Sequence, residues 1–206
     1  IREGIMLIDH LLELVSIVPH PDMTGVRVAE QLVDDVLQEI LDPNGQMNQG
    51  RAQTCAPAGI QTMLINANAA EYARLQRGLL SATGQATLAN GDVVSPPVGI
   101  FRAANYAGDQ SSAFYVRTNA ELAFQAMLLK YARGSDFPRF DPDAPPDSPR
   151  GINTVFQATI ARGLTFDEIK TALDGLFNAN FTKRIEAAPS DALRNQFVND
   201  MQSSSD

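Results

Sequence analysis

Apolar residues recur at helical spacing through the first forty positions of the chain. The first such stretch contains Met6, Leu7, Leu11, Leu12, Leu14 and Val15, and this spacing predicts an amphipathic helix. The Pro-His-Pro run at 19–21 ends it, because proline lacks an N–H and disfavours helical backbone before it. Thr24 is the predicted cap of a second helix, whose apolar face extends from Val26 to Ile40. The Asp-Pro-Asn-Gly run at 42–45 predicts the turn that ends this helix.

The pattern changes from polar to helical in the middle of the chain. Residues 46–54 are polar, and the next helix is predicted to begin abruptly at Cys55 and to end near 66–68. Pro57 fits this prediction because the first turn of a helix tolerates proline. A further helix is predicted over 69–80. Residues 85–94 predict a β-hairpin, since Asn90-Gly91 separates two short β-prone runs.

Two capping boxes mark the later helices. Thr118 precedes Glu121, and Thr165 precedes Glu168, at the spacing of this motif. Ser190 is predicted to cap a last helix that ends near 201. Between these helices, residues 136–149 carry five prolines and four aspartates and predict a surface loop.

The predicted fold class is therefore mainly α, with one short β-hairpin. Hydrophobic residues make up 44% of the 206 residues, which is enough for a buried core. No repeat or domain-scale linker interrupts the pattern. Residues 1–206 are expected to form a single domain, with a candidate boundary between sub-lobes at 136–150.

Charge and cysteine content narrow the classes of partner. The formal net charge is −8 without a basic patch, so neither nucleic acid nor a membrane surface is an expected partner. No apolar run approaches the roughly 18 residues of a transmembrane helix. The single cysteine excludes an internal disulfide and a Cys-rich zinc site. No cofactor is expected, and the compartment stays open.

Cys55 is the residue with the clearest candidate chemistry. A cysteine in the first turn of a helix has its thiolate stabilised by the helix dipole and by unpaired backbone N–H groups. Gln49 precedes it by six residues. If the intervening loop folds back, the Gln49 amide and the Cys55 N–H form a pair of donors for the oxyanion of a tetrahedral intermediate.

The segment at 48–55, which reads Asn-Gln-Gly-Arg-Ala-Gln-Thr-Cys, resembles the nucleophile region of papain-like cysteine peptidases, bacterial papain-like domains included. In that family Gln-Gly is followed, after three residues, by a small residue and then by the nucleophile. Gln49, Gly50 and Thr54 match this order. The resemblance implies the helical, Cys-bearing lobe of an α+β fold, with a peptide or protein substrate, Cys55 as nucleophile and Gln49 as oxyanion donor.

The sequence also departs from the family pattern. Ala56 stands where the family often has tryptophan, and Ala52 replaces a structural cysteine. The family's base is a histidine far downstream, whereas no histidine follows Cys55 here. Three explanations stay open: a C-terminal segment or second chain supplies the histidine, the lobe serves as a non-catalytic binding or scaffold module, or the pattern is coincidental.

Other titratable residues have ordinary structural interpretations. A lone cysteine in a helical protein is most often a small buried hydrophobe. His10 beside Asp9 and His20 between prolines are expected to be boundary and loop residues, although either could serve a permuted active site. The aspartates of 136–149 lack the glycine and glutamate of an EF-hand, so no calcium site is predicted. The leading hypothesis is a papain-like cysteine peptidase whose base lies outside this sequence.

Overall fold

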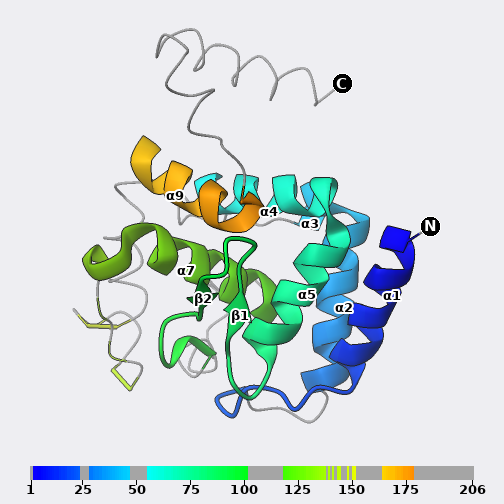
Figure 1. Ribbon diagram of the computed structural model, residues 1–206. Helices are drawn as coiled ribbons and strands as arrows, with labels where there is room; N and C mark the ends of the chain where they lie inside the picture. The colour runs from blue at the N-terminus through cyan, green and yellow to red at the C-terminus, as the bar shows by residue number, and fades with distance from the viewer. Residues whose placement is uncertain are drawn as a thin grey trace, which may run out of the picture.

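The computed structural model of the chain describes residues 2–23, 28–46, 55–101, 118–137 and 164–178, together with 139, 141, 143, 144, 148, 150 and 151. This part of the protein is mainly α-helical with one short antiparallel hairpin, which confirms the predicted fold class (Figure 1). The longer helices are α1 (Arg2–Val15), α2 (Val28–Leu41), α4 (Cys55–Ala67), α5 (Ala69–Leu80), α7 (Asn119–Arg133) and α9 (Phe166–Phe177).

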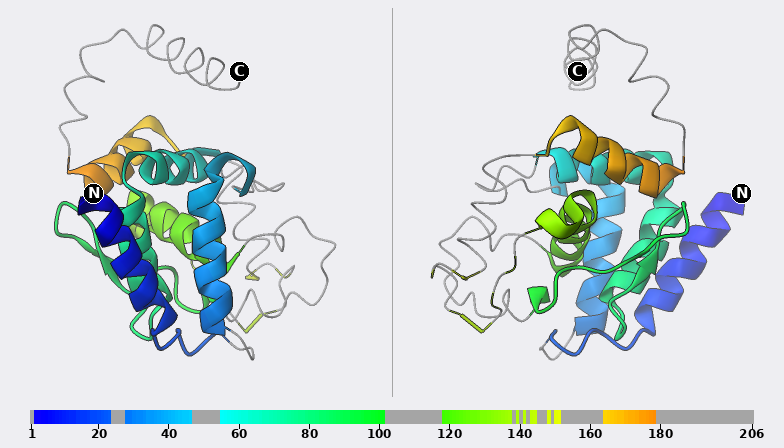
Figure 2. Two further views of the ribbon diagram at one scale, coloured as in Figure 1. Left: turned by 90° about the vertical axis from the view of Figure 1, so that its right-hand side faces the viewer. Right: turned by 60° about the vertical axis from the view of Figure 1, so that its left-hand side comes forward.

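The helices pack in two directions around one core. Helices α1, α2 and α5 stand side by side, and α4 and α9 lie across one end of them (Figures 1 and 2). Helix α7 crosses behind the hairpin and contacts α4, α5 and α9. The largest fully buried side chains are Leu14, Leu32, Leu64, Tyr72, Leu75, Leu79, Leu80, Ile100, Phe101, Phe124 and Met127. Every long helix except α9 contributes to this set, so the core depends on all of these helices together.

Local capping chemistry explains where several helices begin and end. The Thr165 hydroxyl accepts from the Glu168 N–H while the Glu168 carboxylate accepts from the Thr165 N–H, as the capping box predicts. The Thr118 hydroxyl likewise accepts from the Glu121 N–H at 2.9 Å. Asn68 caps α5 through the Glu71 N–H at 3.0 Å. Asn178 ends α9 in the left-handed region, at φ 44°.

The structure differs from the prediction at two turns. Residues predicted as a simple turn form the short helix α3 (Pro43–Gln46), because the Asp42 carboxylate accepts from the Gly45 N–H at 3.0 Å. The hairpin pairs β1 (Ala86–Thr87) with β2 (Val93–Val94), so residues 88–92 connect the strands instead of a two-residue Asn-Gly turn. The Leu88 N–H donates to the Asp92 carbonyl at 2.8 Å and closes this longer loop.

Several predictions fall wholly or partly outside the described residues. The Thr24 cap, most of the polar run at 46–54 and the helix at 190–201 lie outside them. In the predicted loop, the short 3-10 turn η1 (Gly134–Asp136) follows α7, and Asp136, Arg139, Asp141 and Asp143 are exposed. None of the described helices is long and apolar enough to cross a membrane. The single-domain assignment and the boundary at 136–150 stay predictions.

Candidate functional site

Cys55 is the first residue of α4, where the sequence predicted a helix to begin. The structure describes the backbone at this position, whereas the Cys55 side chain lies outside the described residues. Gln49 and Gly50 lie outside them as well. The predicted pairing of the Gln49 amide with the Cys55 N–H therefore stays a prediction, and what the structure contributes is the helix start.

The first turn of α4 suits a negatively charged group such as a thiolate. Backbone N–H groups in the first turn of a helix have no intrahelical partner. Pro57 has no N–H, so Cys55 and Ala56 supply the amides at this end. No acidic residue lies in the first turn, so no carboxylate there opposes a negative sulfur. A helix of 13 residues with such a start favours an ionised thiol at its first position.

One face of helix α4 is mostly apolar. Pro57, Ala58, Ile60 and Leu64 are buried, and the helix contacts α5 and α7. Gln61 interrupts this face and is 0% exposed. A buried amide needs hydrogen-bond partners, and the partners of Gln61 come from three other helices.

A buried group of polar side chains, here named the Glu39 cluster, joins α2, α4, α5 and α7. Its members are Glu39, Gln61, Tyr72, Gln76, Thr118, Glu121 and Gln125. The Gln61 amide donates to Glu39 Oε2 at 3.3 Å and to the Tyr72 hydroxyl at 2.7 Å. The Gln125 amide donates to Gln61 Oε1 at 3.1 Å and to Glu121 Oε1 at 2.9 Å. The cluster thus attaches the Cys55-bearing helix to the rest of the core.

Counting donors fixes the direction of the bond between Tyr72 and Glu39. The Tyr72 oxygen accepts from the Gln61 amide and from the Gln76 amide, the latter at 2.6 Å. Both phenol lone pairs are then used, so its proton goes to Glu39 Oε2. Thr118 Oγ1 donates to Glu39 Oε1 at 2.6 Å. In this arrangement the Glu39 carboxyl receives three neutral donors.

Burial governs the ionisation of Glu39, which is 1% exposed. Desolvation raises the pKa of Glu39 to about 7, and its hydrogen bonds to Thr118, Tyr72 and Gln61 offset this only in part. Asp35, one turn earlier on α2, adds a like charge that raises it further. The pKa of Asp35 is itself raised to about 6, mainly by burial. Helix α2 therefore carries two carboxyls that titrate near neutrality.

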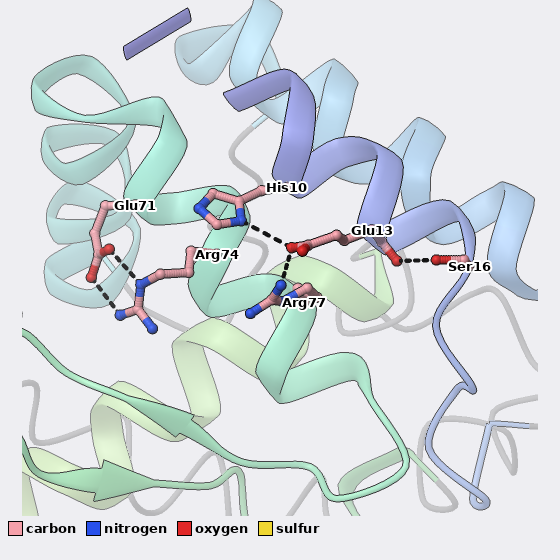
Figure 3. Close-up of polar contacts among 6 residues, drawn as sticks. All are labelled: His10, Glu13, Ser16, Glu71, Arg74 and Arg77. Carbon is pink, nitrogen blue, oxygen red and sulfur yellow. Dashed lines mark hydrogen bonds and ion pairs between the residues drawn. The ribbon is translucent and has the colours of Figure 1, made fainter. Parts of the chain in front are cut away.

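His10, the first candidate base, lies between α1 and α5 (Figure 3). Its Nδ1 lies 3.3 Å from Glu13 Oε2, and Glu13 also pairs with Arg77. Burial and the positive charges of Arg77 and Arg74 lower the pKa of His10. Among the described residues it has no hydrogen bond to α4. The structure gives the permuted use of His10 no support.

His20, the second candidate base, lies in a small pocket after α1. Its Nδ1 accepts from the Asp22 N–H at 3.2 Å, and its ring is 5.1 Å from that of Phe101. The pocket of about 210 Å³ also includes Gly84 and Ser95. A Cβ at Gly84 would lie 3.0 Å from the imidazole, so close packing there requires glycine. This agrees with the predicted structural role of His20.

A second pocket, of about 410 Å³, lies beside the first and is lined by Lys130, Phe137 and Arg139 among others. Lys130 Nζ donates to Ser95 Oγ at 2.9 Å and to the Ser95 and Pro96 carbonyls at 3.1 and 3.2 Å. Three acceptors take up the three ammonium protons. Lys130 therefore connects α7 to the segment after β2.

The Glu39 cluster was missed by the sequence prediction although a signal for it is present. Leu32, Val36 and Glu39 follow one helical stripe of α2 at spacings of four and three. Gln61, Gln76 and Gln125 likewise occupy buried positions of their helices. Polar residues at the core positions of four separate helices predict a shared buried network, and this reasoning could have found it.

No protein-family model matches the chain, and no match was found among curated proteins or solved structures. The resemblance to papain-like peptidases therefore rests on the residues at 48–55 and on the helix that follows them.

Proposed function

We propose that the protein is the helical, Cys-bearing part of a papain-like cysteine peptidase, in which Cys55 is the nucleophile of peptide-bond hydrolysis. The observation that carries the proposal is the start of α4 at Cys55, six residues after Gln49. The dipole and the first-turn amides of this helix end favour the thiolate, which is the reactive form of cysteine.

The proposed reaction has two stages. The Cys55 thiolate attacks the carbonyl carbon of the substrate, and the Gln49 amide with the Cys55 N–H stabilises the oxyanion. The C–N bond then breaks, and the departing amine takes a proton from an imidazolium. Water, deprotonated by the same imidazole, hydrolyses the thioester and releases the carboxylate product.

The imidazole is proposed to come from a further segment or a second chain. His10 and His20 are the two histidines of the sequence. His10 is engaged with Glu13 on α1, and His20 with Asp22 and Phe101. Both therefore have roles of their own, and a histidine from outside this sequence fits the resemblance better than either.

A peptide aldehyde tests this proposal without requiring turnover. An aldehyde adds to a reactive thiolate and forms a tetrahedral adduct whose oxygen occupies the oxyanion position. We expect a reversible adduct at Cys55, detected by intact mass under native conditions and by binding calorimetry. Gln49→Ala should weaken binding about tenfold or more, because one oxyanion donor contributes roughly 10²-fold or more to catalysis.

Gln53→Ala is the matched control, since Gln53 lies in the same polar run but outside the family pattern. We expect it to bind the aldehyde like the wild type, and Cys55→Ala to abolish the adduct. Equal weakening by Gln49→Ala and Gln53→Ala would contradict the assignment of Gln49. An adduct that survives Cys55→Ala would contradict the assignment of the nucleophile.

The alternative of a binding or scaffold module is favoured by one observation. Ile8, Leu12 and Val15 form a row on the outer face of α1 and are 58%, 63% and 54% exposed. Exposed apolar rows of this kind often mark contact surfaces. The aldehyde experiment separates the two functions. The adduct of a peptidase depends on Cys55, whereas a module would bind its partner through exposed residues such as Leu12.

A further inference from the structure

Gln61 connects the Cys55-bearing helix to a buried carboxyl. It lies six residues after Cys55 in α4, and its amide reaches Glu39 on α2 and Tyr72 on α5. Its oxygen accepts from Gln125 on α7. The apolar contacts of α4 are not directional, whereas these hydrogen bonds depend on the rotation and height of the helix. We therefore expect the hydrogen bonds of Gln61 to determine the rotation and height of α4.

We propose that Glu39 is the positioning residue for α4: its protonated carboxyl, acting through Gln61, fixes the helix that begins at Cys55, and loss of that proton loosens the helix. The proposal rests on the proposed function for its relevance to catalysis. Its physical content, a proton-dependent attachment of α4, needs no catalytic activity. Glu39 is not proposed to touch the substrate.

The hydrogen-bond directions explain how one proton affects α4. The Glu39 carboxyl receives donors from Tyr72, Gln61 and Thr118. A protonated carboxyl is also a donor and needs an acceptor. The Thr118 hydroxyl accepts from the Glu121 N–H and has a second lone pair, which supplies that acceptor for a proton on Glu39 Oε1. The protonated carboxyl thus keeps Oε2 as the acceptor of Gln61 and Tyr72, whereas ionisation leaves a buried charge at the point where α4 is attached.

The described groups around Glu39 are acidic or neutral. Asp35 lies one turn away on α2, Tyr72 faces it from α5, and Thr118 faces it from the start of α7. Glu121 of α7 joins the cluster through Gln125. Among the described residues, no cation contributes to the pKa of Glu39. A buried carboxylate in such surroundings favours opening of the structure to water.

The direction of the pH effect follows from linkage. The pKa of Glu39 is about 7 in the closed structure, against an ordinary value of 4.5 for a solvated glutamate. An opened state therefore loses its proton at lower pH than the closed state does. Closure should weaken about tenfold per pH unit from about pH 4.5 to about pH 7 and then level off.

Hydrogen exchange of α4 in the full chain measures this closure directly. Exchange rates are divided by those of the unfolded peptide at each pH, which gives protection factors. In the wild type we expect protection of α4 to fall about tenfold per pH unit up to about pH 7. Protection that is constant over this range in the wild type would overturn the proposal, without any variant being needed.

Three variants separate positioning from general stability. Glu39→Gln keeps the shape but removes the titration, so its α4 protection should be independent of pH. Gln61→Met removes the link, so α4 should lose its pH dependence while the first turn of α7, held by Thr118, keeps it. Asp35→Asn removes the other raised carboxyl of α2 and should leave the slope at α4 in place. A wild-type slope in Glu39→Gln would contradict the proposal.

The result also stands apart from the proposed function. Alkylation of Cys55 reports the thiol, and α4 protection reports the helix. A normal thiol with a Glu39-dependent α4 would reject the peptidase and leave the positioning intact. An activated thiol with pH-independent protection of α4 would support the peptidase and reject the positioning role of Glu39.

Discussion

Two polar regions of this protein balance charge in different ways. The Glu39 cluster is buried, spans four helices and contains carboxyls with neutral donors. The ion-pair row between α1 and α5, formed by His10, Glu13, Glu71, Arg74 and Arg77, is partly exposed and pairs opposite charges (Figure 3). Water screens the row, whereas desolvation governs the cluster. Removal of one side chain should therefore matter far more in the cluster than in the row.

The largest expected effect is the pH dependence of stability that Glu39 imposes. Its raised pKa means that the stabilisation is complete below about pH 4.5 and is lost as the pH rises to about 7. This amounts to about 3 kcal/mol in the free energy of unfolding, at roughly 1.36 kcal/mol per pH unit. Urea unfolding at several pH values should show this loss in Asp35→Asn, which lacks the other raised carboxyl, and little of it in the double variant Asp35→Asn with Glu39→Gln. An unchanged pH profile on addition of Glu39→Gln would remove the contrast between the two regions.

The next effect is that of Tyr72→Phe in the same cluster. It leaves the Gln61 and Gln76 amides short of an acceptor and Glu39 short of a donor. We expect a loss of about 1–3 kcal/mol in the free energy of unfolding, as for a buried polar group left unsatisfied. Tyr131→Phe is the matched control, because its hydroxyl contacts Asp92 and Asn90 at the exposed loop. Similar losses for both tyrosines would contradict the ranking.

A smaller effect is expected from the ion-pair row. Arg77→Met removes the partner of Glu13 but keeps most of the apolar stem. Exposed pairs contribute about 0.2–1 kcal/mol, and salt screens them. The difference between wild type and Arg77→Met should shrink further in about 1 M salt, where the Debye length is about 3 Å. A loss as large as that of Tyr72→Phe would place the row among the main determinants of stability.

The smallest expected effect is that of His10, whose contribution to stability changes with pH in the opposite direction to that of Glu39. The pKa of His10 is lowered, first by burial and then by Arg77 and Arg74. Its contribution to stability is therefore present above the unfolded value of about 6.5 and lost as the pH falls through the folded pKa. His10→Gln should flatten this acid limb, measured against the double variant Asp35→Asn with Glu39→Gln as the background, so that both raised carboxyls are absent. Stability of that background that increases on acidification would contradict the direction.

The described helices were predictable because local rules and periodicity agreed with the fold. The capping box at Thr165 and the helix start at Cys55 are where the sequence placed them. The hairpin loop was less predictable, since the bond from Leu88 to Asp92 extends the turn beyond Asn90-Gly91. The Asn90 N–H also donates to the Gly175 carbonyl of α9 at 3.3 Å, and local propensity does not reveal such a tertiary contact.

The candidate site was predictable only in part. The segment at 48–55 indicates a nucleophile by resemblance, but its partners depend on chain segments that pattern alone cannot bring together. Glu39 and Gln61 are 22 positions apart and meet only when α2 and α4 pack. Considered alone, each is an ordinary helix-forming residue. Burial, which depends on tertiary packing, is what turns them into a coupled pair.

The pH profile of alkylation at Cys55 tests the central claim most directly. Cys55 is the sole cysteine, so carbamidomethylation by iodoacetamide, followed as intact mass, reports this thiol alone. We expect a half-maximal rate about one pH unit or more below the value of about 8.5 for a free thiol. A profile centred near that ordinary value, unchanged by Gln49→Ala, would contradict the assignment of Cys55 as a nucleophile.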